Sequence, residues 1–305
     1  MVSQSVRLSN GERMSSVTPM TPTTVLSASD PRLDPFRNMK GQGPRPDGTF
    51  VAESELVLQH IFESAIAVRA LLIAPARAAR LRDVLATYVE RQATPIEVFV
   101  ADRSVIDEVI GYPLHRGVIV LAERPTPLSA ADVLKSAQTV VVLENVIDPD
   151  NVGTMFRHAA GFGVDAVLLH GPTGDPLYRK TLRTSMGWTL RIPYARTSLG
   201  SNVSELLAEA GFLSLALTPS PAADNLPDVL RFVDTDQKLA LLLGAEGPGL
   251  TDETLQEADH RVRIPLSDGV DSLNVSTAGA IALYALSVAH PTRLAGRADR
   301  KRQSG

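Results

Sequence analysis

The chain of 305 residues contains no cysteine. Disulfide bridges, thiolate metal ligands and cysteine nucleophiles are therefore all excluded. This absence fits a cytoplasmic location, which we expect for the protein.

Long apolar runs are also missing. The longest candidate, 275–289, is shorter than the roughly 20 residues that a membrane span needs, and it is rich in Ala and Ser. Residues 1–30 are rich in Ser and Thr and lack the charged and then apolar order of a signal peptide. We therefore expect no membrane partner, and we predict a disordered or extended N-terminal segment over 1–48.

The common fingerprints of nucleotide and metal sites are absent as well. The glycine-rich turn GAEGPG at 244–249 matches neither the dinucleotide pattern G-x-G-x-x-G nor the triphosphate pattern G-x-x-x-x-G-K-S/T. A nucleotide-dependent oxidoreductase is therefore disfavoured. Clustered His, Asp and Cys with metal-ligand spacing are missing too, so we expect no metal.

The residues that are present indicate a soluble α/β protein with two domains, since 44% are apolar and 21% are charged. Residues 49–124 form a small unit with helices expected at 54–64 and 75–92. Alternating or continuous apolar residues in the same unit predict strands at 67–74, 95–101 and 117–123. Pro125 and Pro127 then mark a linker.

A larger domain is predicted over 136–291, followed by a basic tail over 292–305. Near-continuous Val and Leu runs separated by helices indicate a parallel sheet covered on both faces. The expected strands are 139–143, 165–169, 190–195, 212–218, 239–243 and 261–265.

Three loops at strand ends of this domain carry polar side chains. Asn151 and Arg157 are placed around the start of one helix, Glu246 lies in the glycine-rich turn, and Ser272 and Asn274 precede the helix that begins near 275. Such loops form the ligand crevice of an open α/β sheet. Helix capping is the alternative for Ser272 and Asn274, and a tight turn alone would explain the glycines.

Three stretches, NVGTMFRHAAGFGVDAVLL, LLLGAEGPGL and IPLSDGVDSLNVSTAGAIALY, resemble in order and spacing the three motifs of the SpoU/TrmH class of SPOUT methyltransferases. These enzymes are S-adenosylmethionine-dependent RNA ribose 2′-O-methyltransferases. The resemblance covers roughly 137–290, and the domain before it is similar to a substrate-binding domain often fused to them. It implies a parallel-sheet SPOUT domain with a deep trefoil knot, which is an exception to the rule that chains do not thread loops.

The resemblance also implies S-adenosylmethionine as cofactor, a homodimer, and ribosomal RNA rather than transfer RNA as substrate. The implied catalytic residues are Arg157, Asn151, Glu246, Ser272 and Asn274. The implied cofactor contacts, mostly through backbone groups, are Leu243, Gly244, Gly249, Ile264, Leu266 and Leu273. Candidates for the dimer surface are Val152, Phe156 and Ala160 on one helix and Ala280, Tyr284 and Ser287 on another.

The charge distribution gives some independent support for an RNA partner. The net charge of −4 is not typical of a nucleic-acid-binding protein, but 176–196 contains five basic residues, three aromatic residues and no acid. Such a stretch is typical of contacts with a phosphate backbone, and a solvated face with packed aromatic rings is the alternative. A catalytically silent RNA-binding protein is a further alternative, which the intact motif residues disfavour.

Overall fold

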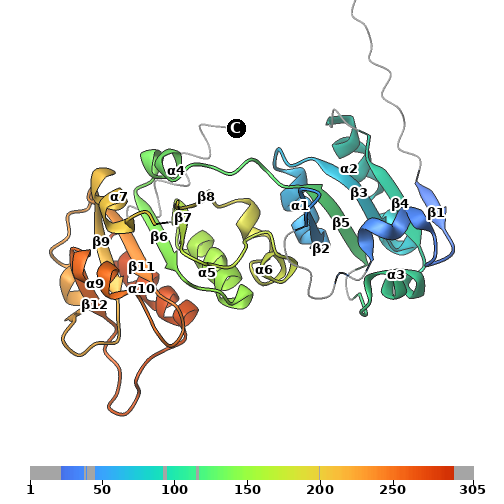
Figure 1. Ribbon diagram of the computed structural model, residues 1–305. Coiled ribbons are helices and arrows are strands. Elements are labelled where there is room, and N and C mark those ends of the chain that lie inside the picture. Colours follow the sequence, from blue (N-terminus) through green and yellow to red (C-terminus); the bar gives the residue numbers. More distant parts are fainter. Residues whose placement is uncertain are drawn as a thin grey trace, which may run out of the picture.

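The computed structural model describes residues 22–37, 39, 45–91, 95–114, 117–198 and 200–291. Two separate β-sheets divide these residues into two lobes that lie side by side (Figure 1). We call residues 22–124 the first lobe and residues 130–291 the second lobe. The predicted tail at 292–305 and residues 1–21 lie outside the described residues. No helix in the described ranges combines the length and apolar character that crossing a bilayer requires.

The first lobe is built on a five-stranded mixed sheet with the strand order β1-β4-β3-β5-β2. Its strands β1 and β4 run parallel to β3, and β5 runs antiparallel to β3 and β2. Helices cover both faces of this sheet. The elements are β1 (Thr23–Val25), η1 (Pro31–Phe36), β2 (Thr49–Glu53), α1 (Glu55–Phe62), β3 (Val68–Ile73), α2 (Pro75–Arg91), β4 (Glu97–Ala101), α3 (Arg103–Ile110) and β5 (Val118–Glu123).

The first lobe begins earlier than residue 49, where the sequence placed its start. Strand β1 pairs with β4, and the 3₁₀ helix η1 buries Leu33 and Phe36 completely against one face of the sheet. Part of the predicted N-terminal segment 1–48 is therefore ordered. The sequence pattern misses it because both elements are short and their partners, β4 and α3, lie far along the chain.

The second lobe is built on a seven-stranded parallel sheet, as predicted, with the order β10-β12-β9-β11-β6-β7-β8. Its elements are α4 (Ala130–Ser136), β6 (Thr139–Glu144), α5 (Pro149–Gly161), β7 (Ala166–His170), α6 (Arg179–Thr184), η2 (Trp188–Leu190), β8 (Tyr194–Arg196), α7 (Val203–Glu209), β9 (Phe212–Leu217), β10 (Asp224–Asn225), α8 (Leu226–Leu230), β11 (Lys238–Leu243), α9 (Asp252–Glu257), β12 (His260–Arg263) and α10 (Val275–Ala289).

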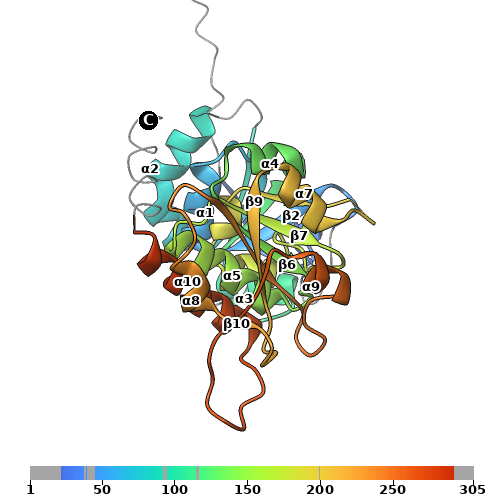
Figure 2. The ribbon, with the colours of Figure 1, turned by 90° about the vertical axis from the view of Figure 1, so that its left-hand side faces the viewer.

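Alternate residues of the second sheet pack on opposite faces, which explains the continuous apolar runs in its strands. Val141, Leu143 and their neighbours pack under α5, α8 and α10. Val140 and Val142 pack under α4 and α7 on the other face. The side view of the second lobe shows α5, α8 and α10 close together, with the long segment between β12 and α10 projecting from the body (Figure 2).

Two boundaries differ from the sequence expectation. Helix α4 ends at residue 136, where the second domain was expected to start, and its Val133 and Leu134 are buried in the second lobe. The expected strand 190–195 is instead a 3₁₀ turn, η2, followed by the short strand β8. Apolar residues such as Ile192 are buried there without belonging to the sheet. The trefoil knot stays a prediction.

Candidate functional site

The carboxyl ends of β6 and β11 lie side by side, because these strands are parallel neighbours in the sheet. The loop after β6 leads into α5, which starts after the capping residue Asp148 and carries Asn151 in its first turn. The loop after β11 carries Glu246, and the segment after β12 leads to Asn274 at the start of α10. Parallel strands thus bring the three predicted loops to one edge of the sheet.

Three of the predicted catalytic residues form one hydrogen-bonded cluster. The Asn151 side-chain amide donates to Glu246 Oε1 at 2.9 Å. The Asn274 amide donates to Asn151 Oδ1 at 2.9 Å and to Glu246 Oε1 at 2.6 Å. Asn151 is buried, with 5% of its surface exposed, whereas Glu246 and Asn274 are exposed. The cluster therefore joins the loops after β6, β11 and β12 and presents its carboxylate at the surface.

Asn274 also caps α10. Its Oδ1 accepts hydrogen bonds from the backbone N–H groups of Ser276 and Thr277 at 3.0 and 3.2 Å. The sequence left capping open for both Ser272 and Asn274, but Ser272 is exposed and lies three residues before Val275, the first residue of the helix. Asn274 thus combines two roles: its side-chain oxygen caps the helix, and its side-chain NH₂ group donates to Asn151 and Glu246.

The glycine-rich turn is closed tightly around Glu246. Ala245 and Gly249 exchange two backbone hydrogen bonds, and Gly247 and Gly249 have φ angles of 87° and 77°, which favour glycine. Gly244 has no room for a side chain, since the backbone of Gly249 and Leu250 passes directly over it. The glycines therefore permit a tight turn, as the sequence allowed, and the cofactor contact of Gly249 stays a prediction.

A buried carboxylate anchors the end of this turn. Glu144, the last residue of β6, is fully buried and accepts hydrogen bonds from the Thr251 backbone N–H at 2.7 Å and from Thr254 Oγ1 at 2.6 Å. This contact fixes the glycine turn against the neighbouring strand.

A cavity of about 310 Å³ opens beside the cluster, between the ends of β9, β11 and β12 and the start of α10. All six residues predicted to contact the cofactor line it, together with Glu246 and Ser272. Sequence reasoning missed Leu217, Thr218 and Pro219, which also line the cavity. The end of the predicted strand 212–218 was the signal that could have identified them, because it meets the same edge of the sheet.

Arg157 does not join the cluster. It lies in the second half of α5, two turns beyond Asn151, and not at the helix start as the sequence suggested. The side chain is exposed, and within the part of the chain that the structure describes it forms no ion pair. Glu246 contacts Asn151 rather than Arg157, so the guanidinium is available to an external anion.

The basic stretch 176–196 is mostly engaged inside the protein. Arg179 and Arg183 pair with Glu53, Arg191 pairs with Glu63, and Lys180 pairs with Asp150. Arg196 donates to the backbone oxygens of Gly171 and Thr173. Tyr194 packs edge-on against Phe156, and Trp188 packs against His60. This stretch therefore joins the two lobes instead of forming a free basic surface.

In the described ranges, no group of three or more His, Cys, Asp or Glu side chains could hold a metal ion. The predicted absence of a metal stays a prediction.

A parallel sheet with a cavity and a polar cluster at its carboxyl edge is the arrangement by which open α/β proteins bind a ligand. Residues 138–284 match the model of the SpoU rRNA Methylase family. An uncharacterised tRNA/rRNA methyltransferase of Mycobacterium tuberculosis is 43% identical over 265 residues, which span 85% of this chain and 90% of that protein. A 23S rRNA guanosine 2′-O-methyltransferase of Bacillus subtilis is 35% identical over 174 residues, spanning 54% of this chain and 67% of that protein.

Among solved structures, an AdoMet-bound rRNA methyltransferase from Sinorhizobium meliloti superposes with a TM-score of 0.74 at 25% identity. The superposition covers 88% of this chain and 98% of the other. The chain belongs to the SpoU rRNA methylase family, as its three motifs predicted.

Proposed function

We propose that this protein methylates the 2′-hydroxyl group of a ribose in ribosomal RNA, using the residues assembled at the carboxyl edge of the second sheet. Membership of the SpoU family makes the chain an RNA ribose 2′-O-methyltransferase with S-adenosylmethionine as its cofactor. The observation that carries the proposal is the Asn151–Glu246–Asn274 cluster at the rim of a cavity lined by every predicted cofactor residue.

The cavity fits the proposed cofactor in size and chemistry. Its walls include Leu217, Ile264 and Leu266, which offer an apolar surface to an adenine ring, and the ends of three strands supply backbone groups. Gly244, Gly247 and Gly249 of the glycine-rich turn line the same cavity. When bound, S-adenosylmethionine supplies a methyl group activated by its sulfonium.

The chain's own residues then have to place the ribose oxygen and favour its loss of a proton. We assign Arg157 to the RNA, where its free guanidinium binds a phosphate and stabilises negative charge developing on the ribose oxygen. A guanidinium is a poor base because it stays protonated in proteins. The proton therefore passes to phosphate or solvent. Asn151, Glu246, Ser272 and Asn274 hold the rim of the cavity in the shape that the ribose must fit.

The choice of ribosomal RNA rests on relatives that are named 23S rRNA methyltransferases. Transfer RNA is the second candidate, because the Mycobacterium tuberculosis relative is named a tRNA/rRNA methyltransferase. Because ribosomal and transfer RNA are both cytoplasmic, we propose a cytoplasmic location for the protein.

Radiolabelled S-adenosylmethionine tests the function directly. The purified chain is incubated with an unmodified 23S rRNA transcript or with unmodified tRNA, and the product is hydrolysed in alkali. A 2′-O-methyl group blocks cleavage at its own nucleotide, so label should be recovered in an alkali-resistant dinucleotide from 23S rRNA. Label in tRNA alone would show that transfer RNA, and not ribosomal RNA, is the substrate. Label in a base would contradict ribose methylation.

We also propose a homodimer that uses the exposed apolar face of α10. Ile281, Tyr284 and Val288 are 39%, 61% and 59% exposed, and the Tyr284 ring lies beside Phe162. Val152 and Phe156 cannot contribute as the sequence suggested, because both are fully buried. Tyr284→Glu should shift the mass found by light scattering from two chains to one. A monomeric wild-type protein at micromolar concentration would contradict the dimer.

A further inference from the structure

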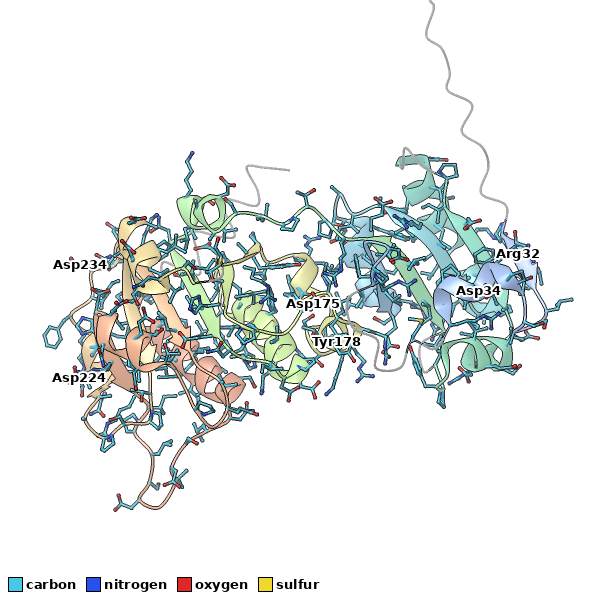
Figure 3. All side chains as sticks on the ribbon, viewed as in Figure 1. Arg32, Asp34, Asp175, Tyr178, Asp224 and Asp234 are labelled. Carbon is cyan, nitrogen blue, oxygen red and sulfur yellow. The ribbon has the colours of Figure 1, made fainter. Side chains whose placement is uncertain are left out.

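Helix α6 lies between the two lobes and contacts both (Figure 3, near Asp175 and Tyr178). Its apolar residue Leu182, together with Leu177 just before the helix, is buried in the core of the first lobe. Residues at positions i and i+4 share one face of a helix. Arg179 and Arg183 thus point to the first lobe, while Lys180 and Thr184 point to α5.

On the face of α6 that points to the first lobe, both arginines contact Glu53 at the end of β2. Its carboxylate is 3.1 Å from Arg179 and 3.5 Å from Arg183, and it accepts a hydrogen bond from the Tyr112 hydroxyl at 3.1 Å. Only 9% of Glu53 is exposed, and the Arg179 guanidinium stacks over the Tyr112 ring at 4.4 Å. Burial and the nearby Glu53 carboxylate raise the pKa of Tyr112, so its hydroxyl stays a donor.

On the second face, α6 fixes the start of α5. Asp150 is 2.8 Å from Lys180 Nζ and accepts a hydrogen bond from Thr184 Oγ1 at 3.0 Å. The Lys180 ammonium is the largest cause that lowers the pKa of Asp150. Gly153 lies so close that a Cβ added there would be 2.7 Å from the Thr181 backbone oxygen. Asp150 directly precedes Asn151, so the position of α6 bears on the catalytic cluster.

We propose that Glu53 is a positioning residue for methyl transfer: it holds α6 through Arg179 and Arg183, and α6 holds Asp150 and hence the neighbouring Asn151. The first lobe thus acts on the chemical step as well as on RNA binding. This inference rests on the proposed function, because Asn151 is assigned to the site that shapes the ribose pocket. A displacement of about 1 Å at a reacting group lowers turnover by as much as about 100-fold.

Glu53→Gln tests the proposal, with Glu55→Gln as the matched control. Glu55 also pairs with two arginines, Arg77 and Arg80, but these pairs lie entirely within the first lobe. Steady-state kinetics use the full chain and an unmodified 23S rRNA transcript. We expect Glu53→Gln to lower kcat about tenfold, with the S-adenosylmethionine Kd from calorimetry unchanged, and Glu55→Gln to leave kcat unchanged.

Tyr112→Phe is the milder second variant, should Glu53→Gln fail to fold, and it should lower kcat by a smaller factor. In a double-mutant cycle, Asp150→Asn should make most of the Glu53→Gln effect disappear, because both changes break the same connection. A variant with normal kcat and only a raised KM for RNA would reduce Glu53 to a docking role and overturn the proposal.

Hydrogen exchange separates this proposal from the proposed function. The backbone amides of residues 150–157 should exchange faster in Glu53→Gln than in Glu55→Gln, whether or not the transcript is methylated. If the wild-type chain methylates neither RNA, the proposed function fails, and faster exchange still supports the mechanical link. Equal exchange and equal kcat in the two variants would refute the link.

Discussion

At the scale of single residues, the exposed guanidinium of Arg157 and the hydrogen-bonded cluster of Asn151, Glu246 and Asn274 have different roles. Arg157 lies outside the cavity lining, whereas Glu246 and Ser272 belong to it. Arg157 is exposed and forms no ion pair in the described ranges, so it adds little to folding stability. We therefore expect the Arg157 guanidinium to act by binding an anion of the substrate.

We expect Arg157→Ala to cut kcat by roughly 100-fold or more, which is the scale measured when one donor to a developing oxyanion is removed. The Kd for S-adenosylmethionine should change less than about twofold, since the residue does not line the cavity. Calorimetry with the cofactor beside methyl-transfer kinetics measures both. Weakened cofactor binding with normal turnover at saturation would disprove the assigned role.

Asn274 offers a way to separate helix capping from catalysis. Asn274→Ala should lower the free energy of unfolding by about 1 kcal/mol, because α10 loses its cap. Asn274→Ser restores a capping oxygen but cannot reach both Asn151 and Glu246 as the amide does. Serine should therefore recover most of the lost stability in urea unfolding, while methylation stays as low as in the alanine variant. Full recovery of activity with serine would mean that only the cap matters.

At the scale of elements, close helix crossings fix the site. Gly153 on α5 packs against the α6 backbone, and Gly279 on α10 packs against Met155 of α5. A methyl group at Gly153 would meet the α6 backbone, whereas one at Gly279 would meet the ends of the Met155 and Leu243 side chains, which can shift.

We expect Gly153→Ala to destabilise the protein by about 1–3 kcal/mol, since the new Cβ would meet a backbone oxygen that cannot move independently. Gly161→Ala on the same helix is the control. A Cβ there has nothing within 4 Å, so alanine should be neutral or stabilise by up to about 1 kcal/mol. Urea unfolding compares the two variants, and equal effects would show that the α5–α6 contact is not tight.

Much of this framework could be predicted from the sequence, because strand periodicity and strand-end loops are local signals. The predicted strand 139–143 became β6, and the predicted start of the last helix matches α10. The parallel sheet then places Asn151, Glu246 and Asn274 at one edge. Which amide contacts which carboxylate could not be predicted, since Asn151 and Asn274 lie 123 residues apart and their geometry depends on the packing of α5 and α10.

Contacts between the lobes were equally hidden from the sequence. Glu53 and Arg179 are separated by 126 residues, and nothing local distinguishes a paired arginine from one that awaits RNA. The basic stretch 176–196 has the composition of an RNA-binding surface, but its partners are Glu53, Glu63 and Asp150. The amino-acid composition of a stretch gives its charge but does not identify the residues that form ion pairs with it.

At the scale of the whole molecule, the cavity is built entirely from the second lobe, while that lobe inserts Leu177 and Leu182 into the core of the first. A chain that begins at residue 127 keeps α4 and all cavity residues, whereas one that begins at residue 136 loses Val133 and Leu134 from the second core. The first is therefore the better test of what the second lobe does alone.

We expect the chain from residue 127 to bind S-adenosylmethionine with unchanged affinity but to melt at a lower temperature. Exposing Leu177 and Leu182 costs about 1.5–3 kcal/mol for each side chain. Methylation should be much weaker and should fall more steeply with salt. Calorimetry, thermal melting and methyl transfer at two salt concentrations test this. Wild-type activity at every salt concentration would rule out a role of the first lobe in substrate recognition.

Leu177 and Leu182 belong to the core of the first lobe. They therefore determine which segments must be exchanged together when parts of this protein are swapped with those of a relative. A chimaera joined in the connection between residues 124 and 130 would pair a foreign first lobe with leucines and arginines shaped for the original one. Residues 175–191 should therefore be exchanged together with the first lobe, although they connect two strands of the second sheet, β7 and β8. Recombination, in the laboratory or in evolution, is then constrained to a discontinuous module of residues 22–124 and 175–191.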